Sequence, residues 1–157
     1  MKRFFVGGLV RIVVLAMTGG MVLAAEAPKA DGAADRAALQ GTWQVVVQEM
    51  RGGAAPGDPR EQRMIFAGDS FKLVDGDKVF LRGTFTVDPS KTPRVMEMIV
   101  SEGAGTDHAA PVHGIYELKG GELVWCAGEP GSEARPVKFD TKGTTNVMIR
   151  MKRANGK

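Results

Sequence analysis

Two histidines and two carboxylates are the residues of this sequence best suited to hold a metal ion. Asp107 and His108 are adjacent, Glu102 precedes them and His113 follows. Imidazole and carboxylate groups both bind zinc, but the spacing of these residues matches none of the standard zinc motifs. Asp107 and His108 also fall in a Gly/Ala-rich stretch. We therefore expect solvated loop and strand-edge residues here and no metal site.

Other residue types that could carry catalysis lack the setting that their chemistry needs. The sequence has no Gly-x-Ser-x-Gly elbow. Its only cysteine, Cys126, lies in an apolar stretch and is expected to be a buried, inert thiol. Residues 103–105 (Gly-Ala-Gly) lack the lysine and the strand–loop–helix context of a phosphate-binding loop. Glu97, Glu117 and Glu122 are expected on solvent faces, so we predict no catalytic residue, no cofactor and no enzyme.

The amino-terminal segment, residues 1–25, has the features of an export signal. A basic pair is followed by an apolar run that only Arg11 interrupts, and small residues surround Ala24 and Ala25. The uninterrupted run after Arg11 is shorter than the roughly 20 residues that span a membrane. We expect cleavage after Ala24 or Ala25, delivery to the periplasm or the exterior, and no stable membrane insertion afterwards. An uncleaved membrane anchor is the alternative.

The net charge of +3 comes from that same segment. The chain has 21 basic and 18 acidic side chains, and residues 1–25 hold three of the basic ones and no acidic one. The remainder is neutral, with 18 of each sign, so no basic surface for nucleic acid is expected.

A single cysteine cannot form an internal disulfide, so packing must stabilise the fold. We expect a monomer.

The remaining sequence predicts one domain of short strands. Residues 26–34 have the composition of a disordered leader, residues 35–40 suit a short helix that Gly41 ends, and residues 154–157 should fray. Between the helix and residue 153, alternating apolar segments are separated by Gly, Asp and Pro turn signals. The expected strands are 43–48, 64–66, 71–73, 79–87, 95–100, 112–118, 123–127, 136–139 and 146–152.

These strands predict an all-β fold for residues 35–153. No crossover helix is available, so a parallel sheet is disfavoured, and a sandwich or a closed up-and-down barrel remains. Closure removes exposed strand edges and places the first strand beside the last. Arg153 would then lie over the indole of Trp43 in a cation–π contact, with Arg150 as the alternative if a bulge shifts the register. We therefore expect an antiparallel up-and-down barrel of about 8–9 strands with one short N-terminal helix.

The sequence around Trp43 resembles the lipocalin signature. Gly41-Thr42-Trp43 follows the short helix, and an arginine ends the last strand. In that superfamily the Trp and Arg are structural, which here implies structural roles for Gly41, Trp43 and Arg153, and the cup holds small apolar ligands. The chain also looks like a family of uncharacterised secreted domains numerous in planctomycete bacteria, which brings no established activity. The segments that match that family are 39–43, 81–85, 88–91, 114–118 and 151–153.

The function expected of such a barrel is non-enzymatic binding of a small apolar or amphipathic molecule. A barrel of this size has room for at most one small ligand, methionines adapt to irregular ligands, and Tyr116 and Trp125 each offer one polar group. The alternative is a filled-core structural or interaction domain that contacts a cell-envelope partner through loops 51–60 and 101–111. The lining residues expected for the binding function are Val45, Val47, Leu81, Phe85, Met96, Met98, Tyr116 and Trp125.

Overall fold

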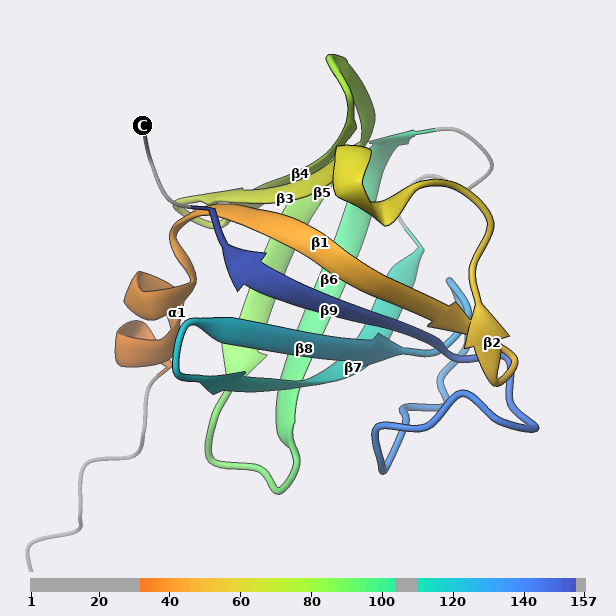
Figure 1. Cartoon of the computed structure of the whole chain (residues 1–157). Helices are drawn as coiled ribbons and strands as arrows, with labels where there is room; N and C mark the ends of the chain where they lie inside the picture. The colour runs from red at the N-terminus through yellow and green to blue at the C-terminus, as the bar shows by residue number, and fades with distance from the viewer. Residues whose placement is uncertain (1–31, 104–109, 155–157) are drawn as a thin grey trace, which may run out of the picture.

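The computed structural model describes residues 32–103 and 110–154 of the 157-residue chain (Figure 1). One short helix, α1 (Ala33–Leu39), precedes the strands, and a single 3-10 turn, η1 (Pro59–Glu61), lies in the loop before β3. The strands are β1 (Gly41–Met50), β2 (Gly53–Ala54), β3 (Gln62–Ala67), β4 (Ser70–Asp75), β5 (Lys78–Asp88), β6 (Arg94–Gly103), β7 (Pro111–Lys119), β8 (Glu122–Ala127) and β9 (Val147–Arg153).

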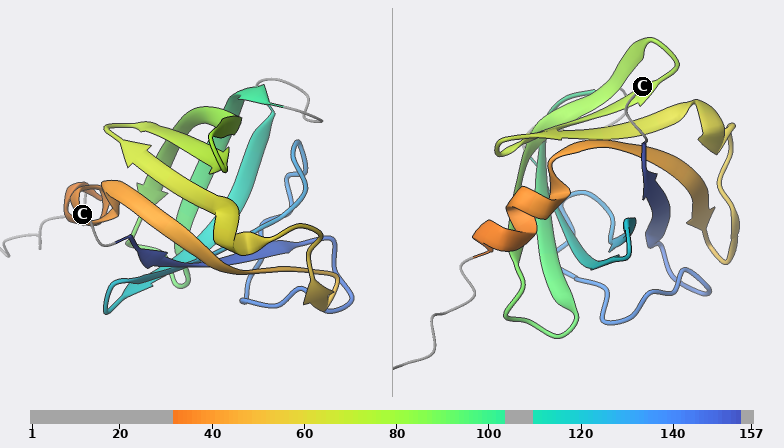
Figure 2. Two further views of the ribbon diagram at one scale, coloured as in Figure 1. Left: turned by 45° about the horizontal axis from the view of Figure 1, so that its top comes forward. Right: turned by 60° about the vertical axis from the view of Figure 1, so that its left-hand side comes forward.

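The strands form a closed antiparallel barrel. Neighbours in the sheet follow the chain in the order β1-β3-β4-β5-β6-β7-β8-β9, and β9 pairs with β1 to complete the ring of eight strands. The short strand β2 pairs only with the end of β1 and lies outside the ring. Figure 2 shows α1 lying at one end of the barrel. The predicted up-and-down β-barrel with one short helix is confirmed.

Inward side chains from every strand of the ring fill most of the barrel. Met96 and Met98 face inward as the alternation of β6 predicts, and Tyr116 and Trp125 lie opposite each other on the inner faces of β7 and β8. A second, smaller apolar cluster of Ile115, Cys126 and Met148 lies on the outer side of the barrel wall, where Phe139 packs against it. The most buried inner residues are Trp43, Val45, Met64, Phe66, Phe71, Phe85, Met96, Met98, Tyr116, Leu123 and Met151.

Three local features differ from the expected elements. The helix begins at Ala33, earlier than expected, inside the segment assigned to the leader. Residues 136–139 form no strand, so that prediction is wrong, and the Val137 side chain is 80% exposed. A closed barrel offers these residues no free edge to pair with. The strand that the sequence did not predict, β2, consists of one glycine and one alanine, which are poor strand formers.

The ends of the chain are only partly described. The expected signal peptide, residues 1–25, and leader residues 26–31 lie outside the described residues, as do residues 155–157 of the expected frayed tail. The first residue of that tail, Ala154, donates its backbone N–H to the Thr42 carbonyl over 2.9 Å. Among the described residues, no helix has the length and apolar character needed to span a membrane.

Candidate functional site

One end of the barrel is closed by a group of residues that we call the floor: Leu39, Trp43 and Arg153. The Trp43 indole is fully buried and its Nε1 donates to the Leu39 carbonyl over 2.7 Å. The Arg153 guanidinium lies 4.3 Å from the centre of the indole ring. It also donates to the carbonyl oxygens of Gln40, over 2.7 Å, and Ala38. The predicted cation–π contact is therefore present. The same guanidinium closes the C-terminal end of α1 through its hydrogen bonds to the Ala38 and Gln40 carbonyl groups.

The register around the floor agrees with the expected roles of Gly41 and Arg153. Gly41 has a φ of 104°, a conformation that favours glycine, and a Cβ there would lie 3.3 Å from Arg153 Nη1. Arg153 pairs with Trp43 across the β1–β9 seam. Arg150, the alternative partner, is exposed and lies opposite Val47 instead. The absence of a side chain at Gly41 therefore leaves room for the Arg153 guanidinium.

Tyr116 belongs to the floor side of the barrel, where its hydroxyl holds α1. The hydroxyl donates to Asp35 Oδ2, and Arg94 Nη1 donates to the same oxygen over 2.9 Å. Burial and this carboxylate neighbour raise the pKa of Tyr116 well above its ordinary value, so the phenol stays neutral. Its polar group, expected to meet a ligand, is used instead to fix the helix.

A cavity of about 200 Å3 lies at the other end of the barrel, and we call it the mouth cavity. Leu81, Met98 and Trp125 line it, as expected. Val45, Phe85 and Met96 are buried deeper, among the side chains that fill the barrel. The lining residues that the sequence analysis missed include Met64, Phe71, Leu73, Phe80, Val100 and Val112. Among the described residues, no charged side chain lines this cavity.

Val47 does not face the barrel interior, so its predicted place in the lining is wrong. The pairing of β1 with β9 shifts between Val45, which lies opposite Met151, and Val47, which lies opposite the outward-facing Arg150. This bulge reverses the alternation of β1. Gln48 then lies opposite the inward-facing Ile149, and Gln48 lines the mouth cavity.

The indole of Trp125 forms part of the cavity wall and lies against Gly114. A Cβ at Gly114 would come within 2.5 Å of Trp125 Nε1. The absence of a side chain at Gly114 therefore lets the ring lie along the backbone of β7. Trp125 Nε1 is buried and has no hydrogen-bond partner among the described residues. Buried polar groups of this kind are uncommon.

The residues considered for metal binding or catalysis either pair with other side chains or lie outside the described residues. Asp107 and His108 lie outside the described residues. His113 Nδ1 lies 3.1 Å from Glu97 Oε1, which also contacts Arg135, and Glu102 pairs with Arg82 on the outer surface. Over residues 32–103 and 110–154, no group of three metal-ligating side chains occurs.

Cys126 is buried as predicted, in the outer apolar cluster. Burial raises the pKa of its thiol, which keeps the sulfur protonated.

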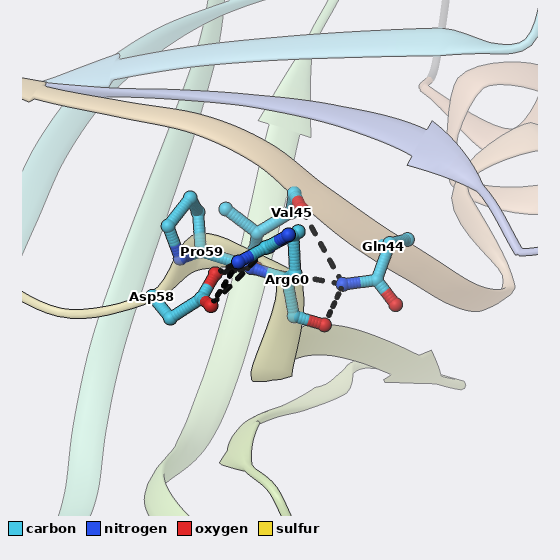
Figure 3. Close-up of polar contacts among 5 residues, drawn as sticks. All are labelled: Gln44, Val45, Asp58, Pro59 and Arg60. Carbon is cyan, nitrogen blue, oxygen red and sulfur yellow. Dashed lines mark hydrogen bonds and ion pairs between the residues drawn. The ribbon is translucent and has the colours of Figure 1, made fainter.

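The loop between β2 and β3 is held by a single side-chain amide (Figure 3). Gln44 Nε2 lies 2.8 Å from the Gln62 carbonyl oxygen. It also lies 2.9 Å from the carbonyl oxygen of Arg60 and 3.4 Å from that of Pro59. Asp58 caps the same turn by accepting from the Arg60 backbone N–H over 2.9 Å. The amide thus gathers carbonyl groups that would otherwise repel one another.

We expect the Gln44→Glu variant to loosen this loop. A carboxylate would place negative oxygens against the three carbonyl oxygens, at a cost of about 1–3 kcal/mol of unfolding free energy. Gln44→Met removes the donor without adding charge and serves as the control. Urea unfolding measures the loss, and limited proteolysis locates it in residues 51–62. Equal losses for the two variants would contradict the electrostatic explanation.

No protein-family model, curated protein or solved structure matches this chain.

Proposed function

We propose that this chain is an exported, non-enzymatic, lipocalin-like barrel domain that binds one small apolar or amphipathic molecule in the mouth cavity. The observation that carries the proposal is the cavity itself. Its described lining is apolar apart from the Gln48 amide, and small-molecule sites are typically concave and apolar with few polar groups.

The volume of the cavity supports a ligand of about one aromatic ring. At about 200 Å3, it lies below the roughly 300 Å3 at which drug-sized pockets begin. Apolar cavities of about 150 Å3 bind benzene. A single ring, or an alkyl chain of similar volume, therefore fits the space between the rim and the filled half of the barrel.

Export and family membership enter this proposal from the sequence. The charged, apolar and small-residue order of residues 1–25 supports cleavage and export. The resemblance to lipocalins and to planctomycete-type secreted domains rests on Gly41-Thr42-Trp43, the arginine that ends the last strand and the other matching segments of the sequence. The proposed form is a monomer with no metal or other cofactor.

Native mass spectrometry of protein purified from its own source tests the proposal directly. We expect a retained small molecule, or binding of toluene-sized probes that changes the fluorescence of Trp125. The Ala127→Leu variant should weaken probe binding at least about tenfold, because Ala127 lines the cavity and a larger side chain occupies the ligand volume.

Ala37→Leu is the matched control, since Ala37 is exposed on α1 at the opposite end of the barrel. It should leave probe binding unchanged. A clean mass for the purified protein, together with no probe binding by the wild type, would refute the proposal.

The second candidate is an interaction domain that contacts a cell-envelope partner through loops 101–111 and 51–60, the latter being the loop that Gln44 contacts. Two observations favour it: the small cavity, and the contacts of Gln44 that hold this loop in one conformation. A pre-formed loop loses less entropy when it binds a partner. If this reading holds, Gln44→Glu should weaken retention of the protein by its own cell-envelope fraction, whereas Ala127→Leu should not.

A further inference from the structure

The bulge in β1 has placed one amide side chain in an otherwise apolar cavity. The shift lies between Val45 and Val47, so Val46 is the extra residue and Gln48 lies opposite Ile149. Ile149 is 3% exposed and faces the barrel interior. Residues directly opposite in an antiparallel pair point to the same side of the sheet, which directs Gln48 inward at the mouth.

The Gln48 amide is available to a ligand. Its backbone carbonyl accepts from the Ala55 N–H over 2.8 Å, but its side chain has no hydrogen-bond partner among the described residues. An amide offers two N–H donors and a carbonyl acceptor. Gln48 can therefore pair with a hydroxyl, a carbonyl or another amide.

Over its described lining, this cavity has no group that would neutralise a charge. Its described lining holds no acidic or basic side chain, and an ion buried without a partner is strongly disfavoured. A ligand that enters this space must leave an ionised group outside in water or lack one.

We propose, on the basis of the function proposed above, that the ligand is uncharged and carries one hydrogen-bonding group beside its apolar body. Gln48 is the specificity-determining residue that pairs with this group. The cavity thus selects neutral alcohols, amides or carbonyl compounds of about one ring over acids and amines of the same size.

Four probes that share one ring test this assignment on the full chain: toluene, benzyl alcohol, benzoate and benzylamine. We expect toluene and benzyl alcohol to bind, and benzoate and benzylamine to bind at least about 100-fold more weakly at pH 7. The decisive quantity is the ratio of the affinities for benzyl alcohol and toluene. In Gln48→Met this ratio should fall by about 2–10-fold, which corresponds to one neutral hydrogen bond.

Val47→Met is the matched control, because Val47 is the neighbouring residue that faces away from the cavity. It should leave the ratio unchanged. Thermal unfolding of both variants establishes that each is folded at the temperature of the titration.

Each outcome separates this inference from the function on which it rests. If toluene binds but the ratio is the same in the wild type and in Gln48→Met, the role of Gln48 is wrong and the binding function stands. If benzoate or benzylamine binds as tightly as toluene, the restriction to uncharged ligands is wrong. If no probe binds the wild type, the proposed function fails.

Discussion

Replacing Trp43 with alanine is expected to lower the free energy of unfolding by about 3–5 kcal/mol. The indole is fully buried, so its removal leaves a large cavity at the floor. The change also removes the hydrogen bond to the Leu39 carbonyl and the ring beneath Arg153. Urea unfolding followed by circular dichroism measures the loss without relying on tryptophan emission.

Trp43→Phe is the informative control for this prediction. Phenylalanine keeps an aromatic face for Arg153 and fills part of the volume, but it loses the N–H that bonds Leu39. Its loss should therefore be clearly smaller than that of the alanine variant. A loss below about 1 kcal/mol for Trp43→Ala, the range of ordinary surface substitutions, would mean that the indole does not close the barrel.

Gly83→Ala is expected to cost about 3 kcal/mol, the upper end of the usual range for an overpacked core. Gly83 lies on the inner row of β5, directly after a register shift between Arg82 and Gly83 in the pairing with β6. A Cβ there would lie 1.9 Å from the Ile99 carbonyl oxygen and 3.0 Å from the Phe71 ring. Backbone of the neighbouring strand cannot move away without breaking the ladder of hydrogen bonds between β5 and β6.

Gly53→Ala provides the matched control. Gly53 is exposed on β2, and a Cβ there would meet no atom within 4 Å. Its unfolding free energy should stay within about 0.5 kcal/mol of the wild type. Similar losses for both glycine variants in urea unfolding would show that crowding by Ile99 does not set the cost at Gly83, since reduced freedom of the unfolded chain would by itself stabilise both variants.

Closure of the barrel was predictable because several independent signals agree on it. The alternation of 79–87 and the turn signals indicate an antiparallel meander, and no segment could serve as a crossover helix. The alternation of the two strands turns Arg153 and Trp43 to the same side of the sheet, so they can meet only if the last strand lies beside the first, as it does. The inner position of Gly83 was also visible, since a glycine among inward-facing residues indicates a sharp bend or a close approach.

Nothing in the sequence indicated the bulge that turns the Val47 side chain outward and brings the Gln48 side chain inward. Val45, Val46 and Val47 are identical residues, so the sequence around the bulge does not mark which residue is the extra one. Only the pairing with β9, far along the chain, decides which valine is the extra residue. In β1, the local alternation therefore assigned the inward-facing residues correctly up to Val45 and wrongly after it.

Two other assignments depended on contacts between distant segments. Tyr116 was expected to offer its hydroxyl to a ligand, but Asp35, 81 residues away, accepts that hydrogen bond. The apolar alternation of 136–139 suggested a strand, whereas Phe139 packs against the outer cluster around Cys126. In both cases tertiary structure determined the contact: Asp35 for the Tyr116 hydroxyl and the outer cluster for Phe139.

The pairing of β1 with β9 also determines where a tether or a fusion partner can be joined to this domain. Gly32 and Ala154, the first and last described residues, both lie at the floor, where Gly32 approaches Val87 and Ala154 bonds to Thr42. A tether or fusion partner joined directly at Gly32 or Ala154 would therefore leave from the side opposite the opening. Immobilising the domain at either of these residues would present the mouth cavity to the surrounding solution.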